Sequence, residues 1–182
     1  MNNAPQPFDN VVRASLRALQ GVVAPALDRD NPLAQEQLAL VCRFLGFVAQ
    51  RAPLAMARQW LELHLAHAMA QELLQAIPGA PQTVREHALA ACDRARTLLD
   101  ASVPDTDRLV AETASLNASI SAWVRSSRAF DPSPRAQLEA IVLRHSQRVT
   151  QLHRAWFSPL GLDPEAAGVP SLESLLAARA QA

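Results

Sequence analysis

The sequence predicts an all-α protein: an antiparallel up-and-down bundle of about six helical segments with a short C-terminal helix. Apolar residues recur at helical spacing, and extended runs of β-branched residues are missing from the chain. Stretches rich in Pro, Asp and Ser interrupt this pattern. Because the expected connections are only about three to six residues long, neighbouring helices should run antiparallel.

The first two expected helices make up the N-terminal third of the bundle. The first begins at residues 9–10, an Asp-Asn pair that can cap free amides, and ends near Asp28 with Pro25 disturbing its last turn. The second covers 32–51, with a proline in its first turn, where a missing amide costs little.

Pro53 marks either a kink or a reversal of the chain. It cannot donate a helical hydrogen bond, and it disfavours helical geometry at the preceding residue. No Gly, Asn or Asp stands beside it to form a turn. The second and third helices are therefore expected to be one kinked helix, with the third segment over 54–77. That segment is apolar around most of its circumference, as in a central helix or one shared with another subunit.

Two further helices have recognisable start signals. Thr83 and Glu86 fit a capping box that opens a helix over 83–101. Asp105 is expected to cap the next helix, which continues to about Phe130.

The last long helix is expected over 134–157, with Ser133 as its cap and a proline in its first turn. Its apolar face follows a 4-3-4-3-4 spacing. That face consists of Leu138, Val142, His145, Val149, Leu152 and Trp156.

The chain changes character after Gly161. We expect a helical bundle over 1–161, then a loop and a short amphipathic helix over 162–182. A helix this short is not stable alone, so it should dock on the bundle, on a second copy or on a partner.

Composition restricts the possible functions. The chain has 17 basic and 17 acidic residues, and all the basic ones are Arg, a bias typical of GC-rich bacterial genomes. A net charge of zero and 4% aromatic residues argue against nucleic-acid binding. Two isolated cysteines, no signal-peptide pattern and no evident membrane span favour a cytoplasmic protein.

Three histidines form a candidate metal site. His64 and His67 share one strip of the third segment, and His145 lies within the apolar face of the last long helix. Together they could hold a divalent metal such as zinc with an open position. No Glu is followed by His three residues later, which argues against a di-iron carboxylate bundle. The alternatives are a small-molecule pocket, or histidines with no ligand at all, and the last is favoured.

Arg125, Arg128 and Arg135 surround a predicted helix end and the next helix start. Such a corner could bind an anionic group, as in a nucleotide or coenzyme A. The alternative is a solvated basic surface. Trp123, Trp156 and Phe157 form a third candidate group, either anchoring a protein partner or closing the ends of the bundle.

These observations favour a non-enzymatic interaction or scaffold protein without a cofactor, acting through protein–protein contacts and self-association. The competing hypothesis is a metal- or ligand-binding bundle, with an active site at the three histidines.

Overall fold

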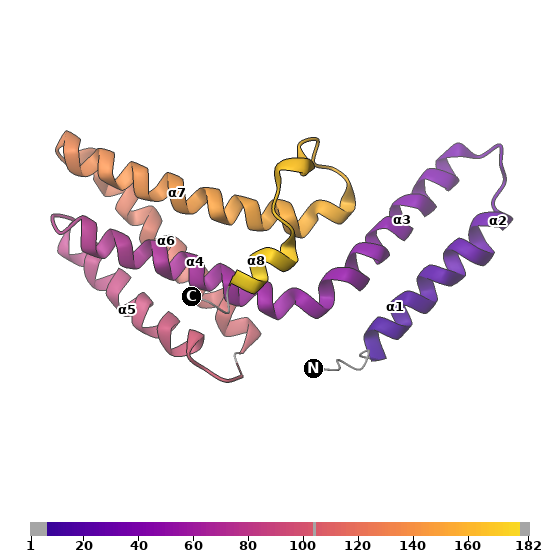
Figure 1. Cartoon of the computed structure of the whole chain (residues 1–182), viewed down its shortest axis with the longest axis horizontal. Coiled ribbons are helices and arrows are strands. Elements are labelled where there is room, and N and C mark those ends of the chain that lie inside the picture. The colour runs from indigo at the N-terminus through magenta and orange to yellow at the C-terminus, as the bar shows by residue number, and fades with distance from the viewer. Residues whose placement is uncertain (1–6, 104, 179–182) are drawn as a thin grey trace. The chain divides into compact units, whose positions relative to one another are not determined.

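A computed structural model describes residues 7–103 and 105–178 (Figure 1). Within these ranges every regular element is helical and there is no strand, which confirms the all-α class. The chain forms two compact units. Unit 1 is Met1–Ala55 with Trp156–Gly168, and unit 2 is Met56–Ala155 with Val169–Ala182. The expected boundary after residue 161 stays a prediction.

The N-terminal arm of unit 1 is one nearly continuous helical stretch. It consists of α1 (Pro7–Ala18), a π-helical turn (Leu19–Val23) and α2 (Ala24–Ala26). The π turn lies directly before Pro25, which has no amide to continue the regular hydrogen-bond pattern. The expected disturbance at this proline is confirmed. The expected start at residues 9–10 is wrong, because the helix already includes Pro7.

The second arm of unit 1 is α3 (Pro32–Arg51), which packs alongside α1 as a helical hairpin (Figure 1). The Asn31 side chain caps α3 by accepting a hydrogen bond of 3.1 Å from the Ala34 amide. A 3-10 turn, Ala52–Leu54, follows directly and leads into α4 (Ala55–Ala76) with helical backbone angles throughout. The expected helical continuation through Pro53 is therefore confirmed.

Unit 2 is built around a core shared by four long helices. These are α4, α5 (Gln82–Leu99), α6 (Thr106–Ser126) and α7 (Pro132–Phe157), and all contribute to one apolar cluster. The expected helical bundle is thus present in unit 2. Its largest fully buried side chains are Leu63, Leu73, Ile77, Leu109, Leu116, Trp123, Leu138 and Leu152.

The helix starts in unit 2 correct two predictions. α5 begins at Gln82 with Pro81 in the cap position and no side-chain cap, so Thr83 lies inside the first turn and forms no capping box with Glu86. Instead the side-chain amide of Gln82 donates a hydrogen bond of 2.7 Å to the Glu86 carboxylate.

α6 begins as predicted, because the Asp105 carboxylate accepts hydrogen bonds from the amides of Asp107 and Arg108. α7 already includes Pro132, so Ser133 is a residue of its first turn and not its cap. The proline at 132 needs no amide partner in a first turn, which lets the helix begin there.

The C-terminal helix, α8 (Leu172–Ala178), belongs to unit 2. The Ser171 hydroxyl caps it by accepting from the Ser174 amide at 3.1 Å. Leu172 is almost fully buried, so α8 docks through its apolar side, as expected for so short a helix.

Candidate functional site

The two histidines of α4 have separate surroundings. The His64 ring stacks on Trp60, with centroids 5.2 Å apart and an interplanar angle of 8°. His67 is buried, and its Nε2 has no hydrogen-bond partner among the described residues. Burial lowers the pKa of both rings, and nearby positive charge adds to the effect, Arg148 at His64 and Arg96 at His67. Both rings are therefore expected to be neutral at pH 7.

His145 is also buried, but it pairs with a carboxylate across the bundle. Its Nε2 lies 2.8 Å from a Glu72 oxygen, so α7 and α4 are joined at this point. Arg144 donates to the other oxygen of the same carboxylate. These two hydrogen bonds lower the pKa of Glu72, and the one from Arg144 has the larger effect.

A second pair of the same kind joins α4 and α7 further along. His153 Nε2 lies 2.9 Å from Glu62, which also accepts from Arg58 at 2.6 Å. Sequence reasoning missed both pairs, because it searched for Glu and His on one helix. In antiparallel helices the positions that meet are far apart in the sequence, and only the register of packing brings them together.

The three predicted metal ligands do not form a cluster. His64, His67 and His145 each have the different surroundings described above. Among residues 7–103 and 105–178, no group of three or more His, Cys, Asp or Glu side chains could hold a metal ion. The geometry gives the predicted metal site no support, and metal binding stays a prediction.

The predicted anion site is partly used within the fold. The Arg135 guanidinium donates to the backbone carbonyl oxygens of Ser127 at 3.2 Å and Arg128 at 2.9 Å, at the end of α6. The Ser127 carbonyl also accepts from the Phe130 amide, so Arg135 adds a second hydrogen bond there and joins the end of this helical stretch to the start of α7. Arg125 and Arg128 have exposed side chains. Arg135 thus has a structural role, and two arginines remain on the surface.

The three aromatic residues predicted as contacts fall into different places. Trp123 has no exposed surface and belongs to the core of unit 2, so it offers no contact area to a partner. In unit 1, Trp156 packs edge-on against Phe47 with centroids 6.2 Å apart, and its carbonyl accepts from Arg51 Nε at 2.9 Å. Phe157 stacks on Phe47 at 5.8 Å and remains 49% exposed.

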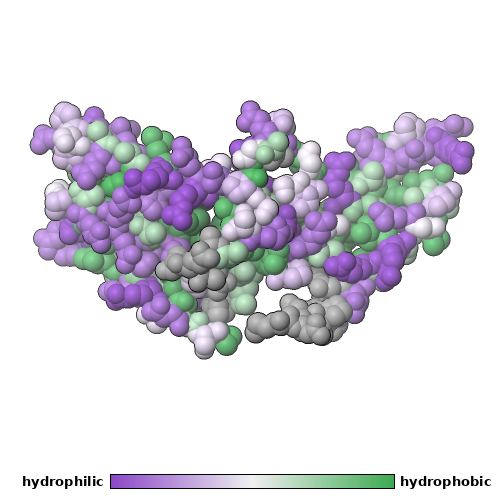
Figure 2. All heavy atoms as spheres, in the orientation of Figure 1, coloured by the Kyte–Doolittle hydropathy of each residue, from purple (hydrophilic) through white to green (hydrophobic). Residues whose placement is uncertain are grey.

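A surface that the candidate residues did not include lies on α3. Leu33, Leu40 and Phe44 are 65%, 46% and 59% exposed, and we call them the α3 stripe. At 100° per residue they fall on one side of the helix, roughly 140–180° from Leu38 and Cys42, which face the other arm. The space-filling view shows apolar residues reaching the surface over the hairpin (Figure 2).

The hairpin buries little of its own apolar surface. Among the apolar side chains of residues 10–55, Val12 and Ala49 are the buried ones. Larger apolar side chains of this range are exposed on both arms, beyond the α3 stripe: Val11, Val22, Val23 and Val41. Two packed helices alone leave their outer faces in water, so the composition of this hairpin fits an element completed by another one.

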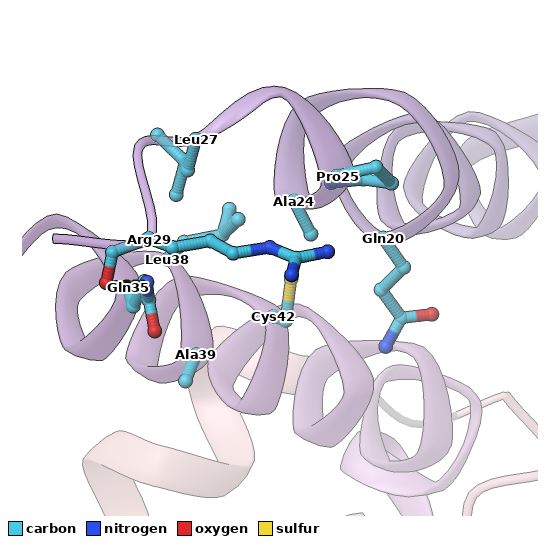
Figure 3. A pocket seen from close by; sticks show the side chains of 9 residues that line it. All are labelled: Gln20, Ala24, Pro25, Leu27, Arg29, Gln35, Leu38, Ala39 and Cys42. Carbon is cyan, nitrogen blue, oxygen red and sulfur yellow. Dashed lines mark hydrogen bonds between the residues drawn. The ribbon is translucent and has the colours of Figure 1, made fainter. Parts of the chain in front are cut away.

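A pocket lies between the two arms of the hairpin, near their connecting turn (Figure 3). Its volume is about 700 Å³, and it is open to solvent on one side. Ala24, Pro25 and Leu27 line one wall, and α3 lines the other, with Arg29 extending from the turn along the space between them. It is lined mostly by apolar and small groups, with no cluster of titratable residues.

The helical stretch Pro32–Ala76 contains an 18-residue window of mean hydropathy 1.4, of which 11% is buried. By length and composition alone this window could cross a membrane. A core helix of a soluble protein passes the same test, so the absence of a membrane span stays a prediction. The low burial of this window contrasts with α4, most of whose apolar residues are buried, and agrees with an uncovered face on α3.

No family model matches the chain, and no curated protein or solved structure is similar enough to bear on its function.

Proposed function

We propose that this is a non-enzymatic scaffold protein that self-associates through the helical hairpin of unit 1, with unit 2 as a stably folded bundle. The observation that carries the proposal is the α3 stripe together with the scarcity of buried apolar side chains in the hairpin. Exposed apolar surface of this extent destabilises a monomer in water and is removed when a second surface covers it.

The exposed area fits a protein interface of ordinary size. The α3 stripe, Val41 and Phe157 are each 46–65% exposed. Together they present on the order of 500 Å² of apolar surface, whereas a standard interface buries about 800 Å² per partner, a little over half of it apolar. One copy of the same surface would therefore cover this one without contributions from elsewhere in the chain.

The charges on α3 favour a protein occupant over a lipid one. Glu36 and Arg43 are both exposed on this helix, among its apolar residues. A helix face with charges of both signs at mid-length is costly to place in hydrocarbon but is ordinary at the edge of a protein interface. Arg51, the last residue of α3, is buried and donates to the Trp156 carbonyl, so its charge is not presented to lipid head groups.

The competing hypothesis, a metal- or ligand-binding bundle, keeps no specific support in the side-chain geometry. His64 stacks on Trp60, His145 pairs with Glu72, and His67 is buried in unit 2. A structural role for them is consistent with a protein that works through its surface, and the zinc experiment in the Discussion tests it.

The proposal is tested by comparing Phe44→Ser with Leu143→Ser in sedimentation velocity. Leu143 is 66% exposed on α7, which belongs to unit 2 and not to the proposed surface, and so is a matched control. If Phe44 is covered in a dimer, about 120 Å² is buried per chain, worth about 3 kcal/mol at 25 cal/mol per Å².

Because both chains of the dimer carry the change, we expect Phe44→Ser to raise the dimer dissociation constant by roughly 10⁴-fold, and Leu143→Ser to leave it unchanged. Equal behaviour of the two variants would contradict the proposal. Flotation of the wild-type chain with lipid vesicles, lost in Phe44→Ser, would assign the surface to a membrane instead.

A further inference from the structure

The exposed face of α3 has the spacing of a helix–helix seam. Leu33, Gln37, Leu40, Phe44 and Phe47 are separated by four, three, four and three residues. This is the heptad pattern with which two helices pack side by side as knobs into holes. The face toward α1 is a different one. Phe47 packs against Trp156 and Phe157 within unit 1, so the exposed part of the seam runs from Leu33 to Phe44.

Opposite charges flank this seam at equivalent positions. Glu36 and Arg43 each stand one residue before a member of the seam and are one heptad apart. Both are exposed, and neither forms an ion pair with another residue that the structure describes. The other flank carries Ala34, Val41 and Val48 and no charge.

We infer that two copies of the chain pair through α3 in an antiparallel, two-fold symmetric seam. In an isologous contact, residue i of one copy meets residue j of the other, and j meets i. Antiparallel packing about the point between Leu38 and Ala39, in the N-terminal half of α3, places Leu33 against Phe44 of the second copy, and Gln37 against Leu40. Both contacts belong to one register, because in each of them the two positions lie equally far from the same point on the helix.

The charges select this arrangement. In the antiparallel pair, each Glu36 lies beside Arg43 of the second copy, and symmetry repeats the contact. In a parallel pair, the same two residues would instead lie beside the uncharged flank. A second copy is therefore complementary to this face in shape, spacing and charge. The inference rests on the proposed function and specifies the partner and its orientation.

The charge pairing is tested by reversal and restoration. Glu36→Arg or Arg43→Glu alone places like charges together twice per dimer, and each should raise the dissociation constant by roughly tenfold at low salt. The double variant Glu36→Arg/Arg43→Glu exchanges the two charges and should restore wild-type affinity. Glu139→Arg, an exposed reversal on α7, is the matched control and should have no effect.

The orientation is tested by disulfide trapping with single cysteines. Mixed Leu33→Cys and Phe44→Cys chains should form a crosslinked heterodimer under mild oxidation, while neither variant alone should crosslink above the wild-type background from Cys42 and Cys92. In an in-register parallel seam, each variant would crosslink to itself. In the antiparallel one, two copies of residue 33 are roughly 16 Å apart along the axis.

The outcomes separate the two proposals. A wild-type chain that is monomeric at all concentrations overturns both. A dimer that is lost in Phe44→Ser but is insensitive to the charge reversals, or that crosslinks residue 33 to itself, overturns the antiparallel seam and leaves self-association standing. Restoration by the double charge exchange together with the 33–44 crosslink supports both.

Discussion

Removing the Glu72 carboxylate tests how α4 and α7 are held together. Glu72→Ala deletes the partner of His145 Nε2, and the ring is only 5% exposed. Its Nδ1 already has no hydrogen-bond partner among the described residues. Both ring nitrogens would then be buried without partners. Leaving a buried polar group unsatisfied costs about 1–3 kcal/mol.

The chain contains its own matched control for this change. Glu62→Ala likewise removes a carboxylate of α4, here one that accepts from Arg58 of the same helix and pairs with His153 of α7, but the His153 side chain is 47% exposed. Water replaces the lost partner at the exposed His153 ring, and a pair with such access to solvent contributes about 0.2–1 kcal/mol. The helix-propensity gain of alanine is the same in both variants and cancels in the comparison.

We expect Glu72→Ala to lower the free energy of unfolding by about 1–2 kcal/mol more than Glu62→Ala. Urea unfolding at neutral pH, followed by the fluorescence of the buried Trp123, measures the difference. A double-mutant cycle with His145→Ala should give a coupling well above that of Glu62 with His153. Equal losses in the two variants, or equal couplings, would refute the assignment of His145 as a buried structural partner.

Three further predictions concern titration, thiol reactivity and metal. The stability of unit 2 should fall as the pH drops below about 6.5, because the pKa values of His64 and His67 are lowered in the folded chain and the unfolded chain therefore binds more protons. The urea midpoint should depend less steeply on pH in His64→Gln/His67→Gln than in the wild type. An identical pH dependence in the two proteins would contradict this prediction. Burial raises the pKa of the Cys92 thiol to about 11, so a thiol reagent should label Cys42 first in the native protein, and equally fast labelling of Cys92 would be inconsistent with its burial. Added Zn²⁺ should leave the thermal unfolding temperature unchanged, and a saturable increase that disappears in the His67 variant would revive the metal hypothesis.

The helices could be predicted from local signals because their causes are local. Asn31 and Asp105 accept hydrogen bonds from the first turns of their helices. Pro53 was read as a continuation because its surroundings lack turn-forming residues, and the backbone stays helical through it. Three predicted helix starts are wrong, those at residues 9–10, Thr83 and Ser133, and each lies one to three residues after a proline. α1 and α7 begin at that proline, and α5 begins directly after it, so the expected side chain is not the cap.

The pairing of helices could not be predicted in the same way. The heptad spacing of α3 is visible in the sequence, but it does not reveal which stripe of that helix faces α1 and which is left exposed. The contacts of Glu62 and Glu72 with α7 likewise depend on the packing register of two antiparallel helices. The candidate histidines were correctly placed on α4 and α7, but their surroundings are set by tertiary neighbours such as Trp60.

The most direct test of the account is the molar mass of the unmodified full chain, measured by light scattering over a dilution series from about 100 to 1 μM. Self-association through α3 predicts a molar mass twice the 19.7 kDa of one chain at the highest concentration, with reversible dissociation on dilution. A mass of one chain throughout the series would contradict it, since the exposed face of α3 would then remain in water.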